Sequence, residues 1–137
     1  MVSTKIDFSA RRARRIEDIT DLVTILFPGN RNQQHAAARI LLTLKCHQSI
    51  VPNLARLEKE HGISRRTLQR TRAKLARLGL IERVTWMNSR YGGQEGWRLS
   101  GRFIASLRQL ADAVDRWRSD KRRERTDKDE RLVGMLG

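Results

Sequence analysis

Residues 63–83 read ISRRTLQRTRAKLARLGLIER, and this stretch decides the fold that the sequence predicts. One face of it repeats at three- and four-residue spacing, as an amphipathic α-helix does: Leu68, Thr71, Leu75 and Leu78. Ser64 stands where a helix N-cap belongs, and Gly79 stands where a helix commonly ends in a left-handed residue. The sequence therefore predicts a helix from Ser64 to Leu78.

The opposite face of this helix carries side chains that suit DNA. With the apolar residues turned inward, a helical wheel of about 100° per residue turns these residues outward: Arg66, Gln69, Arg70, Ala73 and Arg77. Arginine can hold the O6 and N7 of guanine with two hydrogen bonds, and glutamine can do the same with adenine. We therefore expect three residues near the N-terminal end to contact base edges: Arg66, Gln69 and Arg70. Others are expected to meet phosphates at the flanks: Ser64, Arg65, Thr67, Lys74 and Arg77. Arg72, close to the inward face, is expected to serve the domain's own packing.

Two helices are predicted directly before the basic one. The first runs over residues 32–47 with Asn32 as its N-cap, because apolar side chains recur there at helical spacing. The second is short, carries Leu54 and Leu57, and ends at Gly62. A tight glycine turn between two leucine-bearing helices, with Ile63 filling the corner, is what a helix-turn-helix requires.

The period changes after Gly79. Residues 80–87 contain β-branched and aromatic side chains, residues 88–93 have the composition of a turn, and residues 96–99 form a second short extended run. This pattern indicates a β-hairpin. Trp86 and Trp97, on the two strands, are predicted to pack against each other across the hairpin.

The order of short helix, glycine turn, basic helix and hairpin resembles the winged helix-turn-helix regulators of bacteria. The resemblance covers about residues 32–99 and rests mainly on residues 63–83. It implies a mainly α fold with a small β-hairpin wing, flanked by N- and C-terminal helices. It also implies that the hairpin tip lies along a minor groove, where an arginine senses narrow A·T tracts. The expected wing residues are Asn88, Ser89, Arg90 and Tyr91, with Arg90 as the groove contact.

A final long helix is predicted after Ser100 and Gly101. Its apolar residues step by four, three, four and three positions, which is a heptad seam: Phe103, Leu107, Leu110, Val114 and Trp117. Ile104 and Ala111 widen the stripe, so one side of it could pack on its own domain and the other on a second subunit. This helix resembles the dimerisation helices of the MarR and PadR groups. We expect a homodimer on a near-palindromic site, with recognition helices about 34 Å apart. The alternative is a monomer whose stripe packs on its own helices.

The two ends of the chain are strongly charged. An amphipathic helix is predicted from Arg11 to Phe27, and its first turns carry four arginines, an unfavourable sign for a helix N-terminus. Those arginines either contact phosphate or form a solvated face. The expected organisation has four parts: a basic N-terminal helical extension over 1–31, the winged helix-turn-helix over 32–99, a dimerisation helix over 100–118, and a charged, disordered tail over 119–137.

Composition narrows the partner and the compartment. The sequence has 29 Lys and Arg against 15 Asp and Glu, a formal net charge of +14 that attracts polyanions. An anionic membrane surface also fits this charge, but it requires a wide apolar helix face opposed by basic residues, and no segment approaches the roughly 20 apolar residues of a membrane span. The single cysteine, Cys46, cannot form an internal disulfide and is expected to be buried. We expect a cytoplasmic protein that binds nucleic acid and no membrane.

Catalysis finds no support in the sequence. The three histidines and Cys46 match no zinc spacing, and no glycine-rich phosphate loop or nucleophile with a nearby base is present. We therefore expect no enzyme activity, metal or cofactor. The leading expectation is a sequence-specific double-stranded DNA-binding protein, a dimeric transcriptional repressor. A plasmid or phage replication, partition or packaging protein is an alternative. An RNA-binding or ribosome-associated module is another, although the deep, narrow major groove of A-form RNA would leave the basic helix face unused.

Overall fold

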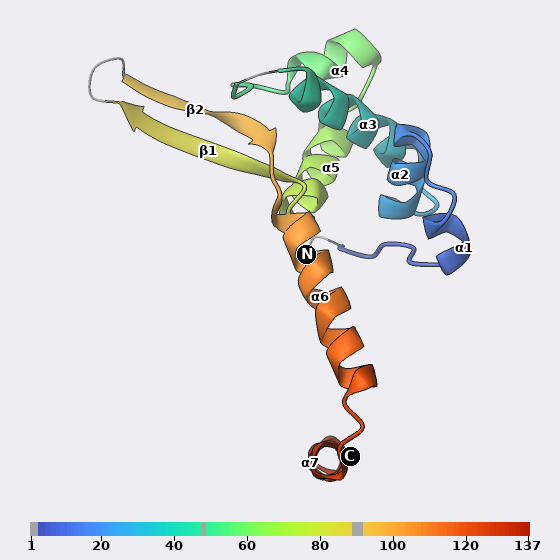
Figure 1. Ribbon diagram of the computed structural model, residues 1–137. Coiled ribbons are helices and arrows are strands. Elements are labelled where there is room, and N and C mark those ends of the chain that lie inside the picture. The colour runs from blue at the N-terminus through green and yellow to red at the C-terminus, as the bar shows by residue number, and fades with distance from the viewer. Residues whose placement is uncertain (1–2, 48, 89–91) are drawn as a thin grey trace. The chain divides into compact units, whose positions relative to one another are not determined.

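The computed structural model describes residues 3–47, 49–88 and 92–137, and for residues 86–88 and 92–94 it describes the backbone alone. The chain is mainly helical, with one two-stranded antiparallel sheet (Figure 1). It forms two compact units, residues 1–103 and residues 104–137. The helices are α1 (Ala10–Ala13), α2 (Ile19–Leu26), α3 (Arg31–Cys46), α4 (Arg56–His61), α5 (Arg65–Leu78), α6 (Arg102–Ser119) and α7 (Arg123–Gly134). The strands are β1 (Ile81–Asn88) and β2 (Gly92–Leu99).

The N-terminal segment forms two short helices, so the prediction of one continuous helix from Arg11 to Phe27 is wrong. The second helix, α2, begins after Asp18, whose carboxylate accepts hydrogen bonds from the backbone N–H groups of Thr20 and Asp21 at 2.9 and 3.1 Å. The Thr20 hydroxyl and these backbone groups lower the pKa of Asp18. Starting α2 at Asp18 places a carboxylate at its positive end, which the helix dipole favours over arginines.

Helix α3 begins two residues earlier than predicted. Its N-cap is Asn30 and not Asn32, because the side-chain oxygen of Asn30 accepts the Gln33 N–H at 3.0 Å. At the other end Cys46 is exposed, which contradicts the expectation that it is buried. Cys46 lies two residues beyond buried Leu44, about 200° around the helix, and so points away from the core.

The core of residues 1–103 surrounds α3. Fully buried side chains come from α3, α5 and β1, with Ile40, Leu75 and Ile81 all at 0% exposure. Val51, between α3 and α4, adds a third extended segment, because its backbone exchanges two hydrogen bonds with Trp97 of β2, at 2.9 and 2.8 Å. The close approach requires glycine at position 96, where a Cβ would lie 2.5 Å from the Val51 carbonyl oxygen. The hairpin is thereby tied to the helical core.

The corner between α4 and α5 agrees with the sequence prediction. Gly62 ends α4 with φ +64° and Gly79 ends α5 with φ +88°, both in the left-handed region. Ser64 caps α5 by accepting the Thr67 N–H at 3.1 Å. Leu54 lies before α4 and not within it, but it is buried all the same. The predicted helix from Ser64 to Leu78 and its two ends are confirmed.

The hairpin pairs differently from the prediction. Its register sets Trp97 opposite Arg83 and Trp86 opposite Gln94, so the predicted packing of Trp86 on Trp97 across the strands is wrong. The second strand begins at Gly92, four residues before the predicted run. Two cross-strand ion pairs, Arg83 with Glu95 and Arg98 with Glu82, join the strands instead. The predicted wing residues Ser89, Arg90 and Tyr91, and the side chain of Asn88, lie outside the described residues.

Residues 104–137 contain most of α6 and all of α7. Helix α7 occupies the segment for which the sequence predicts disorder, so that prediction is wrong. Before it, the Asp120 carboxylate accepts hydrogen bonds from the Arg122 side chain at 2.9 and 2.8 Å, which lower the pKa of Asp120 to about 2. Within the described residues, no helix combines the length and the apolar character needed to cross a bilayer.

Candidate nucleic-acid interface

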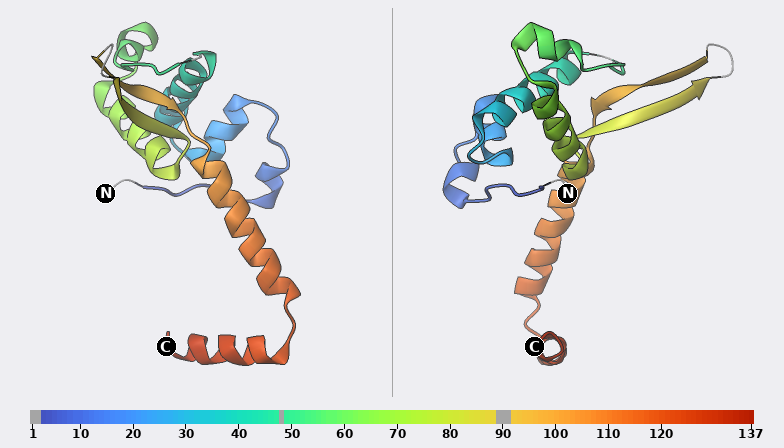
Figure 2. Two further views of the ribbon diagram at one scale, coloured as in Figure 1. Left: turned by 60° about the vertical axis from the view of Figure 1, so that its left-hand side comes forward. Right: turned by 180° about the vertical axis from the view of Figure 1, so that it is seen from behind.

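Helix α5 exposes the face that the helical wheel turns outward. Leu68 and Leu75 are 3% and 0% exposed, because they pack in the core cluster that also contains buried residues of α3. The exposed residues of α5 are polar or basic: Arg65, Arg66, Gln69, Arg70 and Arg77. Seen from behind, α5 lies nearest the viewer in its unit (right panel of Figure 2). The three predicted base-reading residues therefore lie together on one accessible helix face.

The N-terminal turn of α5 uses its hydroxyl groups for the helix itself. The Ser64 Oγ accepts the Thr67 N–H at 3.1 Å and donates to the Thr67 Oγ1 at 2.8 Å. This pair satisfies one of the free amides of the first turn. The hydroxyl groups of Ser64 and Thr67, which were predicted as phosphate contacts, thus stabilise the start of α5.

Lys74 is not the exposed flank residue that the sequence predicts. Its side chain is 7% exposed, and its Nζ donates a hydrogen bond to the backbone carbonyl of Lys5 at 2.6 Å. The same Nζ lies 4.5 Å from the centre of the Phe27 ring. Burial lowers the pKa of Lys74. The helical wheel could not show this, because the cover comes from the N-terminal segment, 69 residues earlier in the chain.

Arg72 fixes the hairpin to the opposite flank of α5. Its guanidinium carbon lies 5.0 Å from the centre of the Trp97 ring, a cation–π contact between α5 and β2. Both residues are half-buried. Arg72 therefore serves the domain's own packing, as predicted, and Trp97 has an arginine as its partner. Sequence reasoning missed this pair, since it paired Trp97 with Trp86.

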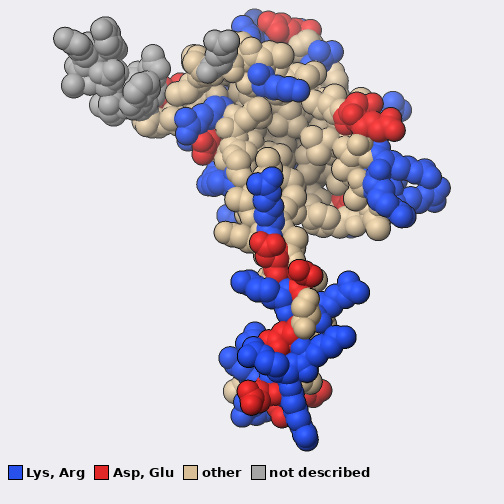
Figure 3. Space-filling model, viewed as in Figure 1, with Lys and Arg blue, Asp and Glu red and all other residues tan. Residues whose placement is uncertain are grey.

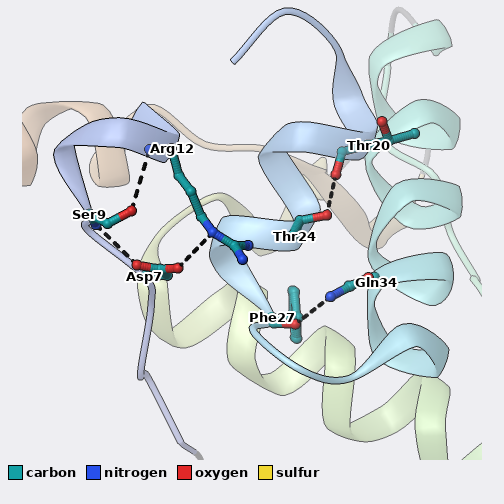
Figure 4. Close-up of polar contacts among 7 residues, drawn as sticks. All are labelled: Asp7, Ser9, Arg12, Thr20, Thr24, Phe27 and Gln34. Atoms are coloured by element: carbon teal, nitrogen blue, oxygen red, sulfur yellow. Dashed lines mark hydrogen bonds and ion pairs between the residues drawn. The ribbon is translucent and has the colours of Figure 1, made fainter. Parts of the chain in front are cut away.

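The N-terminal segment makes polar contacts with α2 and within itself, and Figure 4 draws those among Asp7, Ser9 and Arg12. The Asp7 backbone N–H donates to the Ile25 carbonyl at 2.9 Å, and the Asp7 carboxylate pairs with Arg12 at 3.2 Å. Ser9 accepts the Arg12 backbone N–H at 3.3 Å. In Figure 3, basic and acidic side chains lie side by side where Figure 1 places α1. Part of the N-terminal positive charge is thus neutralised within the chain.

The residues of the predicted dimer seam differ in burial along α6. Phe103 packs against the core of residues 1–103, and its backbone N–H donates to the Gly79 carbonyl at 2.9 Å, which ties the start of α6 to the end of α5. Leu107 is half-buried. Farther along α6 the exposed fractions of the seam residues are large: Leu110 57%, Val114 54% and Trp117 67%. These side chains are open to a partner.

The histidines have ordinary neighbours in the part of the chain that the structure describes, and the Nε2 of His61 lies 3.9 Å from a carboxylate oxygen of Glu60. The rings of His35 and His61 meet edge to face with their centres 6.5 Å apart. The Nδ1 of His47 lies 3.1 Å from the Thr43 carbonyl oxygen. Within residues 3–47, 49–88 and 92–137, no three His, Cys, Asp or Glu residues cluster as metal ligands.

No protein-family model, curated protein or solved structure matches this chain. The residues and the geometry therefore carry the functional inference alone.

Proposed function

We propose that the chain is a sequence-specific, double-stranded DNA-binding protein built on a winged helix-turn-helix, with α5 as the helix that enters the major groove. One observation carries the proposal: α5 buries its apolar face while it exposes Arg66, Gln69 and Arg70 together. These side chains have the donors and acceptors that base edges in a major groove require. Arg65 and Arg77, at the margins of the same exposed face, are suited to phosphates.

The order of elements around α5 supports the winged helix-turn-helix. The elements occur in this order along the chain: α3, the extended segment at Val51, α4, α5 and the hairpin. Gly62 makes the tight turn between α4 and α5. The Val51 segment pairs with β2, and Arg72 of α5 contacts Trp97 of β2, so the base of the hairpin lies beside α5. Under this proposal the hairpin tip, residues 88–91, lies along the neighbouring minor groove.

The exposed part of the seam supports a dimer. Leu110, Val114 and Trp117 keep heptad spacing and are each more than half exposed. A two-fold pair of chains joined through α6 would present two α5 helices to successive major grooves about 34 Å apart. Such a dimer prefers a near-palindromic site, and the simplest activity of a protein that occupies one is transcriptional repression.

Selection of bound sequences from a random duplex pool tests the proposal. The wild-type chain is expected to enrich a motif with two related half-sites. Arg66→Ala is expected to relax the preference at one base pair in each half-site, with a loss of discrimination of about 1–3 kcal/mol. The control Lys45→Ala removes an exposed charge near the end of α3 and should retain the motif.

Two outcomes would contradict the proposal. One is that no motif is enriched, or that Arg66→Ala and the wild type select the same motif. The other is that duplex RNA of equal length outcompetes duplex DNA at the same moderate salt concentration, since A-form RNA does not admit a helix to its major groove.

A further inference from the structure

A hollow of about 590 Å³ lies beside the exposed face of α5, which is within the size range of protein binding pockets. Three segments of the first unit form its walls: the N-terminal segment, the turn between α2 and α3, and α5 itself. The turn is fixed in place because the Gln34 side chain donates to the Phe27 carbonyl at 2.8 Å (Figure 4). Two proposed base-reading residues, Gln69 and Arg70, belong to the α5 wall.

The lining of this hollow is positively charged. Lys5, Arg70 and Lys74 contribute to it, and none of the described residues that line it is acidic. Side-chain amides from Asn30, Gln33 and Gln69 add further hydrogen-bond donors. The lining therefore offers several donors and an excess of positive charge.

Lys74 is the residue that most needs an anion. Its ammonium group is buried, yet it has one hydrogen-bond acceptor, the Lys5 carbonyl, and one aromatic ring beside it. No carboxylate within the described residues forms an ion pair with it. A buried cation without a counter-charge is costly, and the lowered pKa of Lys74 expresses that cost. An ammonium group has three donors, and the Lys5 carbonyl accepts from one of them.

We propose that this hollow binds a phosphate group, held by Lys74, Lys5 and Arg70. A phosphate presents several acceptor oxygens and at least one negative charge, which matches a site with three cations and several amide donors. The phosphate can come from two sources. One is the backbone of a duplex lying against α5, and this source rests on the proposed function. The other is a free phosphorylated small molecule, which would then compete with DNA for the space beside Gln69 and Arg70.

The Lys74 ammonium signal in nitrogen-15 NMR of the full chain tests the site directly. The signal is assigned by its absence in Lys74→Met. We expect it to shift when inorganic phosphate or a 20-base-pair duplex is added, and not when chloride is added at matched ionic strength.

Binding measurements on Lys74→Met identify the source. Methionine keeps most of the length of the lysine side chain and removes the charge, and replacing buried charges by apolar side chains is often neutral or stabilising. If the phosphate belongs to the duplex, affinity should fall by about tenfold, and the slope of log affinity against log salt should flatten by about one unit. The control Lys45→Met removes an exposed lysine of α3 and should change either quantity much less.

If the phosphate is free, inorganic phosphate should shift the Lys74 signal without DNA. It should also weaken duplex binding by the wild type more than by Lys74→Met. The proposal is overturned if neither phosphate nor duplex moves the Lys74 signal and Lys74→Met binds duplex as the wild type does. Should the wild type bind no duplex, the proposed function fails, and the phosphate titration alone still decides this site.

Discussion

Helices α5 and α6 are both amphipathic, with 14 and 18 residues, but they differ in what covers their apolar faces. In α5, Leu75 is fully buried, whereas Leu110 of α6 is 57% exposed. No residue of α6 is fully buried. The two helices therefore share a periodicity but differ in burial. Amphipathicity predicts that an apolar face will be covered, but it does not identify the partner that covers it.

The exposed surfaces of the two helices also differ in kind. Helix α5 presents arginines and a glutamine, which suit a polyanion, and α6 presents leucine, valine and tryptophan, which suit a protein surface. Exposed apolar patches on a protein surface often mark an interface with another protein. Under the proposed function, α5 would meet DNA and α6 would meet a second copy of the chain.

The largest effect is expected from Leu110→Glu. In a dimer joined through α6 the substitution removes two buried leucines and buries two carboxylates, at a cost of about 5 kcal/mol per dimer. Light scattering should then give half the molecular mass of the wild type at the same micromolar concentration. Gln109→Glu, which adds the same charge beside the seam, should remain dimeric. A wild type that is already monomeric would contradict the proposed dimer.

A smaller loss is expected from Leu75→Ala, which truncates a fully buried side chain of α5. Leaving a cavity in the core should lower the free energy of unfolding by about 3 kcal/mol. Denaturant titration of chains that also carry Leu110→Glu measures this in the monomer, without a contribution from association. Val114→Ala in the same background should cost less than about 0.5 kcal/mol, because Val114 is 54% exposed. Equal losses of stability for Leu75→Ala and Val114→Ala would contradict the difference in burial between α5 and α6.

The N-cap of α5 gives the next effect. Ser64→Ala removes the acceptor for the Thr67 N–H and should lower the free energy of unfolding by about 1 kcal/mol. Ser64→Asp should restore most of the loss, since aspartate caps a helix as well as serine does. A stability of Ser64→Ala equal to that of the wild type would mean that Ser64 is not an effective cap. Circular dichroism during thermal unfolding is a sufficient measurement.

Local signals predicted the bounds of α5 and its apolar face, while contacts between distant segments could not be predicted. Ser64, Gly62 and Gly79 are local caps, and the wheel placed Leu68 and Leu75 inward correctly. The burial of Lys74 could not be predicted, because it depends on a carbonyl near the N-terminus.

Two further predictions from the sequence were wrong: the partner of Trp97 and the disorder of residues 119–137. The partner of Trp97 depends on strand register, which a turn of uncertain length leaves open. Helix α7 carries many charges, and a charge-rich composition with few apolar side chains indicates disorder, yet the segment is helical.

Thr71 gives the smallest expected effect, and it concerns the inward face of α5. The wheel turned Thr71 inward, and its side chain is indeed fully buried, but its Oγ1 has no hydrogen-bond partner within the described residues. A buried hydroxyl without a partner destabilises the fold, so Thr71→Val, which replaces it by a methyl group of similar size, should raise the free energy of unfolding by about 0.5–1 kcal/mol.

The matched control is Thr43→Val in α3, whose hydroxyl donates to the Arg39 carbonyl at 2.7 Å. That variant loses a hydrogen bond and should show no gain in stability. Paired denaturant titrations of the two variants measure the difference. If Thr71→Val is less stable than the wild type, the Thr71 hydroxyl has a partner after all, and the inward face of α5 is more polar than its leucines indicate.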